Sequence, residues 1–138
     1  MPGRGEANLK KWAYAIFAVC FMVLWLSGMT AGLTAGACRK DRYQGEKKLR
    51  YCNISLSAGF WIDHSSVDRA KRSILHLERG IALSQLGKDE DARLAFEQAV
   101  IDAATKDGPW VYNLVARISQ FQDTRAHELF SQVARNRK

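Results

Sequence analysis

The stretch RSILHLERGIALSQLGKDEDARLAFEQAVIDA, which runs from Arg72 to Ala103, decides the fold of this chain. Its apolar residues recur every three or four positions, which is the spacing of one face of an α-helix. Gly87 interrupts that spacing as a left-handed helix cap does, and Asp89 suits the start of a second helix. Small and aromatic residues share one face of that second helix: Ala92, Phe96 and Ala99. The stretch therefore predicts two helices joined by a tight turn.

This predicted hairpin resembles a tetratricopeptide repeat. The family pattern has a small residue where the two helices cross, a large apolar residue three positions later and a glycine at the turn. Alanine, an aromatic residue and alanine then follow along the second helix. The matching residues here are Gly80, Leu83, Gly87, Ala92, Phe96 and Ala99. Arg79 departs from the pattern at a usually apolar position, and Ala104 replaces the customary closing proline.

A second and more divergent repeat follows the first. Repeats recur at a fixed period, and the first one covers residues 73–106, so the second covers 107–138. The residues that match the family pattern at this period are Trp110, Ala126 and Phe130. Arg117 and Phe121 depart from it, because an apolar residue and a glycine are expected there. A terminal repeat tolerates such changes, since its outer face meets water.

An uncharged apolar span precedes the repeats. It covers residues 12–37 and follows a basic tail at 1–11. As a helix it is about 39 Å long, more than the hydrocarbon thickness of about 30 Å. We predict an uncleaved transmembrane helix. The alternative is a signal peptide cut before Cys38, for which Ala35 and Ala37 supply the small residues.

Three glycines in this span lie four residues apart: Gly28, Gly32 and Gly36. On a helix they fall near one face, and small residues let two membrane helices approach closely. They are predicted to pack against a partner helix. The alternative is that they have no packing role, because glycine is common in membrane helices.

The net charge of +7 is concentrated after the span. From Arg39 to Arg50 there are six Lys/Arg and two acidic residues, within a predicted basic linker and cysteine-bearing helix at 38–64. Such a segment suits lipid head groups. Nucleic-acid binding is not expected, because the chain lacks alternating aromatic and basic residues.

Cys38 and Cys52 enclose thirteen residues, and a disulfide between them would close a loop that has little means of folding alone. Two unrelated thiols are the alternative; zinc is disfavoured by the lack of histidines at ligand spacing. A disulfide favours an exported compartment. The charge rule favours a cytoplasmic domain, because three Lys/Arg precede the span and six follow it. The chain is similar to exported tetratricopeptide proteins of Gram-negative bacteria, whose paired cysteines often join the leading helices, which implies a periplasmic domain.

No catalytic site is predicted, because Asp63, His64 and Ser65 are adjacent and cannot form a triad with one another. No metal or cofactor site is predicted either, because the sequence has no metal motif and no glycine loop that would bind phosphate. The resemblance instead implies a groove on the first helix of each pair, able to hold a partner helix or peptide. Its residues here are Ile81, Ser84, Gln85, Val111, Val115 and Ile118. The alternative is that the cysteine-bearing segment fills it.

The sequence therefore predicts an all-α protein with one transmembrane helix and a short array of tetratricopeptide-like hairpins at 65–138. The expected function is that of a non-catalytic scaffold or accessory subunit for protein partners in a membrane complex. Mitochondrial import receptors of the outer membrane share the layout of an anchor, a basic linker and one repeat. A receptor for targeting peptides is therefore one alternative, and a secreted domain after cleavage is the other.

Overall fold

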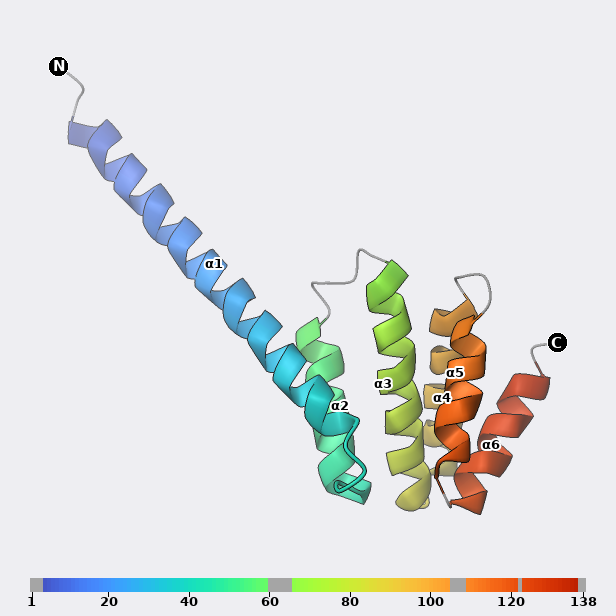
Figure 1. Cartoon of the computed structure of the whole chain (residues 1–138). Coiled ribbons are helices and arrows are strands. Elements are labelled where there is room, and N and C mark those ends of the chain that lie inside the picture. The colour runs from blue at the N-terminus through green and yellow to red at the C-terminus, as the bar shows by residue number, and fades with distance from the viewer. Residues whose placement is uncertain (1–3, 60–65, 105–108, 122, 137–138) are drawn as a thin grey trace.

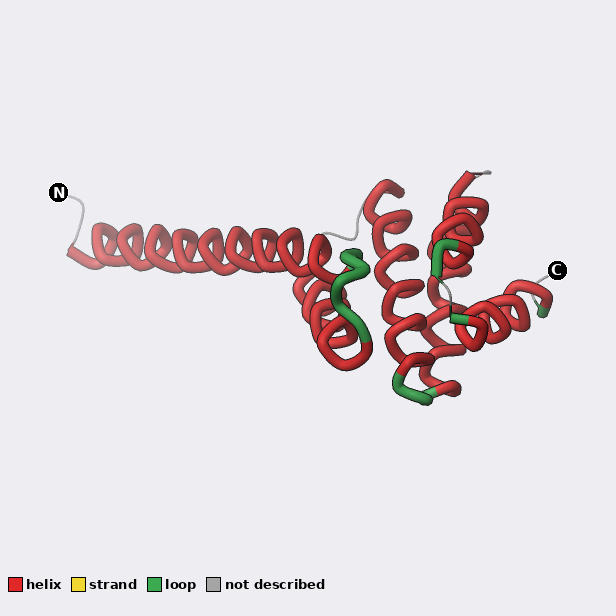
Figure 2. Tube along the Cα trace, turned by 60° about the horizontal axis from the view of Figure 1, so that its bottom comes forward, coloured by secondary structure: helices red, strands yellow, loops and turns green. Residues whose placement is uncertain are grey.

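The computed structural model describes residues 4–59, 66–104, 109–121 and 123–136. All regular structure in these ranges is helical, as predicted. The helices are α1 (Arg4–Cys38), α2 (Gly45–Ala58), α3 (Ser66–Gln85), α4 (Asp89–Ala104), α5 (Pro109–Ser119) and α6 (Thr124–Arg135). Figure 1 shows α1 leaving the other five helices as a long rod. Figure 2 shows the same rod beside a compact helical group.

The turn between α3 and α4 has the predicted glycine cap. Gly87 has a φ of +71°, which favours glycine because other residues rarely adopt it. The Lys88 N–H donates to the Leu83 carbonyl at 3.0 Å, and the Gly87 N–H donates to the Ser84 carbonyl at 3.0 Å. These two bonds form a Schellman motif, which satisfies carbonyls at the end of α3.

The crossing of α3 and α4 depends on Gly80. A Cβ atom at this position would lie 2.5 Å from Cε1 of Phe96, so any side chain would collide with the ring. Phe96 is fully buried and packs edge-to-face on Phe130, with ring centroids 5.7 Å apart. The other buried residues of the repeat pattern are Leu83, Ala92, Ala99 and Ala126. This packing is compatible with tetratricopeptide-like hairpins.

The last two helices continue the core. Leu114 and Ile118 of α5 and Leu129 of α6 belong to the same buried cluster as Phe96. Asp123 caps α6, as its sequence position suggests, by accepting hydrogen bonds from the backbone N–H groups of Arg125 and Ala126. The side chains of the predicted motif residue Trp110 and of Val111 lie outside the described part of the chain.

A second hairpin is formed by α1 and α2. One stripe of α2 is buried, and its members are spaced by four and three residues: Lys48, Cys52 and Ser55. Cys52 is joined to Cys38 by a disulfide, and Ser55 Oγ donates to the Ala31 carbonyl at 3.1 Å. Helix α2 therefore packs on the last part of α1, and the folded domain begins before the boundary at residue 38 that the sequence suggested.

The remainder of α1 is exposed and apolar. Residues Asn8–Cys38 form a helix that is long and apolar enough to cross a membrane. Large apolar side chains along it stay exposed from Leu9 to Leu33, and among its described side chains the first buried one is that of Ala31.

We expect Phe96→Ala to lower the free energy of unfolding by about 3–5 kcal/mol, because it removes a fully buried ring. Gly80→Ala should cost about 1–3 kcal/mol through the collision with that ring. The two changes should not be additive, since removing the ring also removes the collision. Denaturant unfolding followed by circular dichroism measures all three variants. Additive losses would mean that Gly80 and Phe96 do not meet.

Candidate functional site

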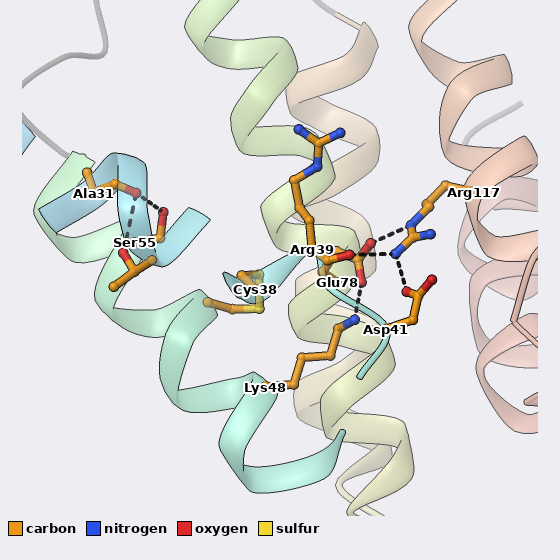
Figure 3. Close-up of a disulfide and its surroundings, with 10 residues drawn as sticks. Ala31, Cys38, Arg39, Asp41, Lys48, Ser55, Glu78 and Arg117 are labelled. Atoms are coloured by element: carbon orange, nitrogen blue, oxygen red, sulfur yellow. Dashed lines mark hydrogen bonds and ion pairs between the residues drawn. A yellow bond between two sulfur atoms is a disulfide. The ribbon is translucent and has the colours of Figure 1, made fainter. Parts of the chain in front are cut away.

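A buried ionic network connects three helices (Figure 3). Nζ of Lys48 in α2 lies 2.6 Å from Oε2 of Glu78 in α3, and both side chains are fully buried. Nε of Arg117 in α5 donates to the other oxygen, Oε1 of Glu78, at 2.5 Å. A buried charge is tolerated when it is paired and hydrogen-bonded. Each oxygen of this carboxylate therefore has its own cation, and each cation comes from a different helix.

Arg117 extends the network to the segment after α1. Its Nη2 donates to Oδ1 of Asp41 at 2.6 Å and to the Arg39 carbonyl at 3.0 Å, and its Nη1 donates to Oε1 of Gln120 at 3.0 Å. The hydrogen bond from Arg117 lowers the pKa of Asp41. Burial works against the charge of Arg117, but its bonds to Asp41 and Glu78 outweigh burial and raise the pKa of Arg117.

Phe121 lies against both cations of the network. Its ring centroid is 5.0 Å from Nζ of Lys48 and 4.8 Å from Cζ of Arg117, which are cation–π distances. Arg117 and Phe121 are the two positions at which the second repeat departs from the family pattern. The structure gives these departures a reason, because both residues belong to the network. Their mismatch was the signal in the sequence that could have revealed it.

The disulfide between Cys38 and Cys52 lies beside this network. Both cysteines are fully buried and pack with Leu75 of α3. Of the two interpretations left open by the sequence, the bridge is therefore the one found. Cys20 is a free and exposed thiol on α1.

A cleft of about 640 Å³ opens next to Arg117, between the end of α1, α3 and α5. It is lined by Gly36, Arg39, Lys40, Ile74, Asn113, Ala116, Arg117 and Gln120. Figure 3 shows the side chain of Arg39 extending away from Arg117, while its carbonyl joins the network. The cleft thus combines three cationic residues with two amides, which suits an acidic or carboxylate-bearing ligand.

The predicted groove does not form one surface, and this prediction is corrected. Ile81 and Ile118 are buried in the core. Ser84 Oγ donates to the Ile81 carbonyl and to Asp123, and Gln85 Oε1 accepts from the Gly45 N–H at 2.9 Å. Val115 is half exposed, near α6. Beside Ser84 and Gln85, the segment leading into α2 and the α6 cap Asp123 line an open cleft of about 630 Å³. The segment before the cysteine-bearing helix therefore borders this end of the predicted groove.

The three glycines of α1 line two different clefts. Gly36 lines the cleft beside Arg117, whereas Gly28 and Gly32 line a smaller one between α1, α2 and α3. In the described chain no other atom comes within 4 Å of a Cβ placed on Gly32 or Gly36. Packing of these glycines against a partner helix therefore stays a prediction. Ala31 and Ala35 are the small residues that meet α2.

His76 is a buried residue of α3, in agreement with the packing role that its sequence position suggests. Burial, with the charges of Arg72 and Arg79, lowers its pKa to about 4. Asp102 lies 3.8 Å away and does not reverse this shift. The imidazole is therefore neutral at neutral pH. Asp63, His64 and Ser65, which the sequence already disfavoured as a triad, lie outside the described residues.

Comparison with protein-family models, with curated proteins and with solved structures gave no match to this chain. The resemblance to tetratricopeptide repeats therefore depends on the motif residues and on the compatible packing of Gly80 against Phe96.

We expect Glu78→Gln to lower the free energy of unfolding by about 3–5 kcal/mol, because it leaves Lys48 as a buried cation without a carboxylate and removes one of the two carboxylates paired with Arg117. Asp41→Asn is the matched control on the same guanidinium. Its side chain is 67% exposed, so the loss should stay below about 1 kcal/mol. Thermal unfolding of the detergent-solubilised chain distinguishes the two. Equal losses would show that Glu78 does not hold the helices together.

Proposed function

We propose that this protein is a membrane-anchored, non-catalytic scaffold or accessory subunit that binds a protein partner of a membrane complex. The cleft beside Arg117 is the observation that carries the proposal. Arg39 and Lys40 contribute exposed cations to it, and Asn113 and Gln120 add amides. An acidic segment of the partner matches this lining in charge and in hydrogen bonding. Tetratricopeptide-like hairpins serve as the frame that holds the cleft.

Helix α1 serves as an uncleaved anchor in this proposal. The uncharged stretch from Trp12 to Leu33, along which large apolar side chains stay exposed, is about 33 Å long, close to the hydrocarbon thickness of about 30 Å. Cleavage after Ala37 would remove Ala31 and Ala35, on which α2 packs. This loss argues against a secreted domain, because the buried stripe of α2 would lose its support.

We assign the folded domain to the periplasmic side. A buried disulfide between Cys38 and Cys52 supports this side, because disulfides persist in exported compartments. The charge rule alone favours the opposite orientation. The cationic cleft also argues against a receptor for targeting peptides, because organellar transit peptides are rich in arginine and would be repelled.

A photo-crosslinking residue at Ala116, which lines the cleft, tests the proposal in native membranes. We expect an adduct with a membrane-complex protein, joined through an acidic segment. The adduct should be lost in the Arg39→Glu/Lys40→Glu variant, because the charge of the cleft is reversed. The same crosslinker at Glu97, an exposed position of α4 away from the cleft, is the matched control. Equal capture at both positions, or capture unaffected by charge reversal, would reject the cleft as the binding site.

We further expect the full-length chain to stay in the membrane after carbonate extraction, with its N-terminus intact. In a Cys20→Ala background, the denatured protein should react with maleimide only after reduction, since the other two cysteines are bonded. An added cysteine at exposed Asn136 should react with an impermeant maleimide from the periplasmic side. A mature N-terminus at Cys38 would contradict the anchor. Maleimide reaction without reduction would contradict the disulfide, and labelling of Asn136→Cys from the cytoplasm alone would contradict the orientation.

A further inference from the structure

A second cleft, of about 210 Å³, lies between α1, α2 and α3. Its floor on α1 consists of small residues: Gly28, Ala31, Gly32 and Ala35. Leu56 and Leu75 add apolar walls, and Lys71 and Arg72 of α3 bring two positive charges to the same cleft. The cleft is therefore apolar inside and cationic on the side of α3.

The position of this cleft along α1 indicates where the cleft lies relative to the apolar stretch of that helix. Exposed large apolar residues of α1 continue to Met29 and Leu33, and the cleft is lined on α1 by residues from Gly28 to Ala35. The cleft therefore lies beside about the last two turns of the exposed apolar stretch. If α1 spans the membrane, as proposed above, the cleft opens at the surface of the bilayer. The inference below rests on that anchoring.

The basic segment from Arg39 to Arg50 does not line this cleft. Arg39 follows the end of α1 at Cys38, six residues or about 9 Å beyond Leu33, and Lys48 is buried against Glu78. Contact of this segment with lipid head groups stays a prediction. The cations that line the cleft are Lys71 and Arg72.

We propose that this cleft binds an anionic phospholipid of the adjoining leaflet. The phosphate group lies against Lys71 and Arg72, and the glycerol and upper acyl chain cover the small residues of α1. Charge complementarity selects the anionic lipid, because lysine and arginine near a membrane surface attract anionic head groups. The small floor gives the chain close contact with the helix.

Two helices of this chain already lie beside the small residues of α1. The cleft is lined on the side of α2 by Ser55, Leu56 and the C-cap Gly59, and on α3 by Lys71, Arg72 and Leu75. A flexible acyl chain adapts to the space between these helices more readily than a rigid partner helix does.

Native mass spectrometry of the full-length protein in detergent tests the inference, with phosphatidylglycerol and phosphatidylcholine offered as an equal mixture. We expect phosphatidylglycerol to be retained preferentially. Lys71→Gln/Arg72→Gln should weaken its binding by about tenfold. Lys47→Gln/Arg50→Gln removes the same charge from exposed positions of α2 and should leave binding unchanged.

Two further measurements separate charge from shape. Gly32→Leu keeps the net charge and fills the floor, where a Cβ meets no other atom within 4 Å, so it should also reduce lipid retention. If Lys71→Gln/Arg72→Gln fails to fold, as shown by loss of its disulfide, lipid retention by Gly32→Leu alone tests the cleft. Inorganic phosphate should not displace the lipid, because it cannot use the apolar floor.

Equal retention of the two lipids, or equal losses of lipid in the two charge variants, would overturn the inference. Unchanged lipid retention in Gly32→Leu would overturn it as well. Displacement of the lipid by inorganic phosphate would also overturn it, because that result indicates a site for anions only. Carbonate extraction of the same variants is read separately. Extraction of the wild-type chain would reject the anchor itself, whereas an anchored chain without preferential lipid would reject only the cleft.

Discussion

The carboxylate of Glu78 is the group on which the arrangement of the helices depends. A buried carboxylate without partners costs several kcal/mol, so the fold must bring cations to it. Lys48 reaches one oxygen from α2 and Arg117 reaches the other from α5. Because the pairs are short and the lysine is fully buried, the positions of α2 and α5 against α3 are coupled through one side chain. Arg117 then fixes the segment after α1 through Asp41, and that segment forms one wall of the cationic cleft.

The features that the sequence predicted are local ones. The α3–α4 hairpin follows from helical periodicity, its turn from Gly87, and its crossing from the pairing of a glycine with a phenylalanine sixteen positions later. The network could not be predicted in this way, because Glu78 and Arg117 are separated by 39 residues and nothing around Glu78 marks it as buried. The groove was misplaced because family geometry assigned to it two residues that are buried in the core, Ile81 and Ile118. Only a three-dimensional arrangement shows which helix faces remain open.

Helix α2 illustrates why a polar sequence can pack well. Its buried stripe contains a lysine, a cysteine and a serine, which read as a poor core pattern. Each member has a specific partner instead: an ion pair with Glu78, a disulfide with Cys38, and a hydrogen bond to the Ala31 carbonyl. Directed bonds replace apolar area here. Ala31 and Ala35, which lie beside the three glycines of α1, take part in this intrachain contact. Their small size lets α2 pack close to the axis of α1.

These bonds also couple α1 to the rest of the domain. Helix α2 is bonded covalently to α1 and ionically to α3, so a rotation of α1 against the rest of the domain would have to break the Lys48–Glu78 pair or distort the bridge. The bridge joins residues only 14 positions apart, so it can form before the later helices are in place. The ion pair needs α3, and the second cation on Glu78 needs α5. Attachment of α1 to α2 is therefore local, whereas the orientation of α1 on the domain depends on α3 and α5. The positions of the two clefts along α1 are then set by the same long-range contact, through Glu78, that holds α2, α3 and α5 together.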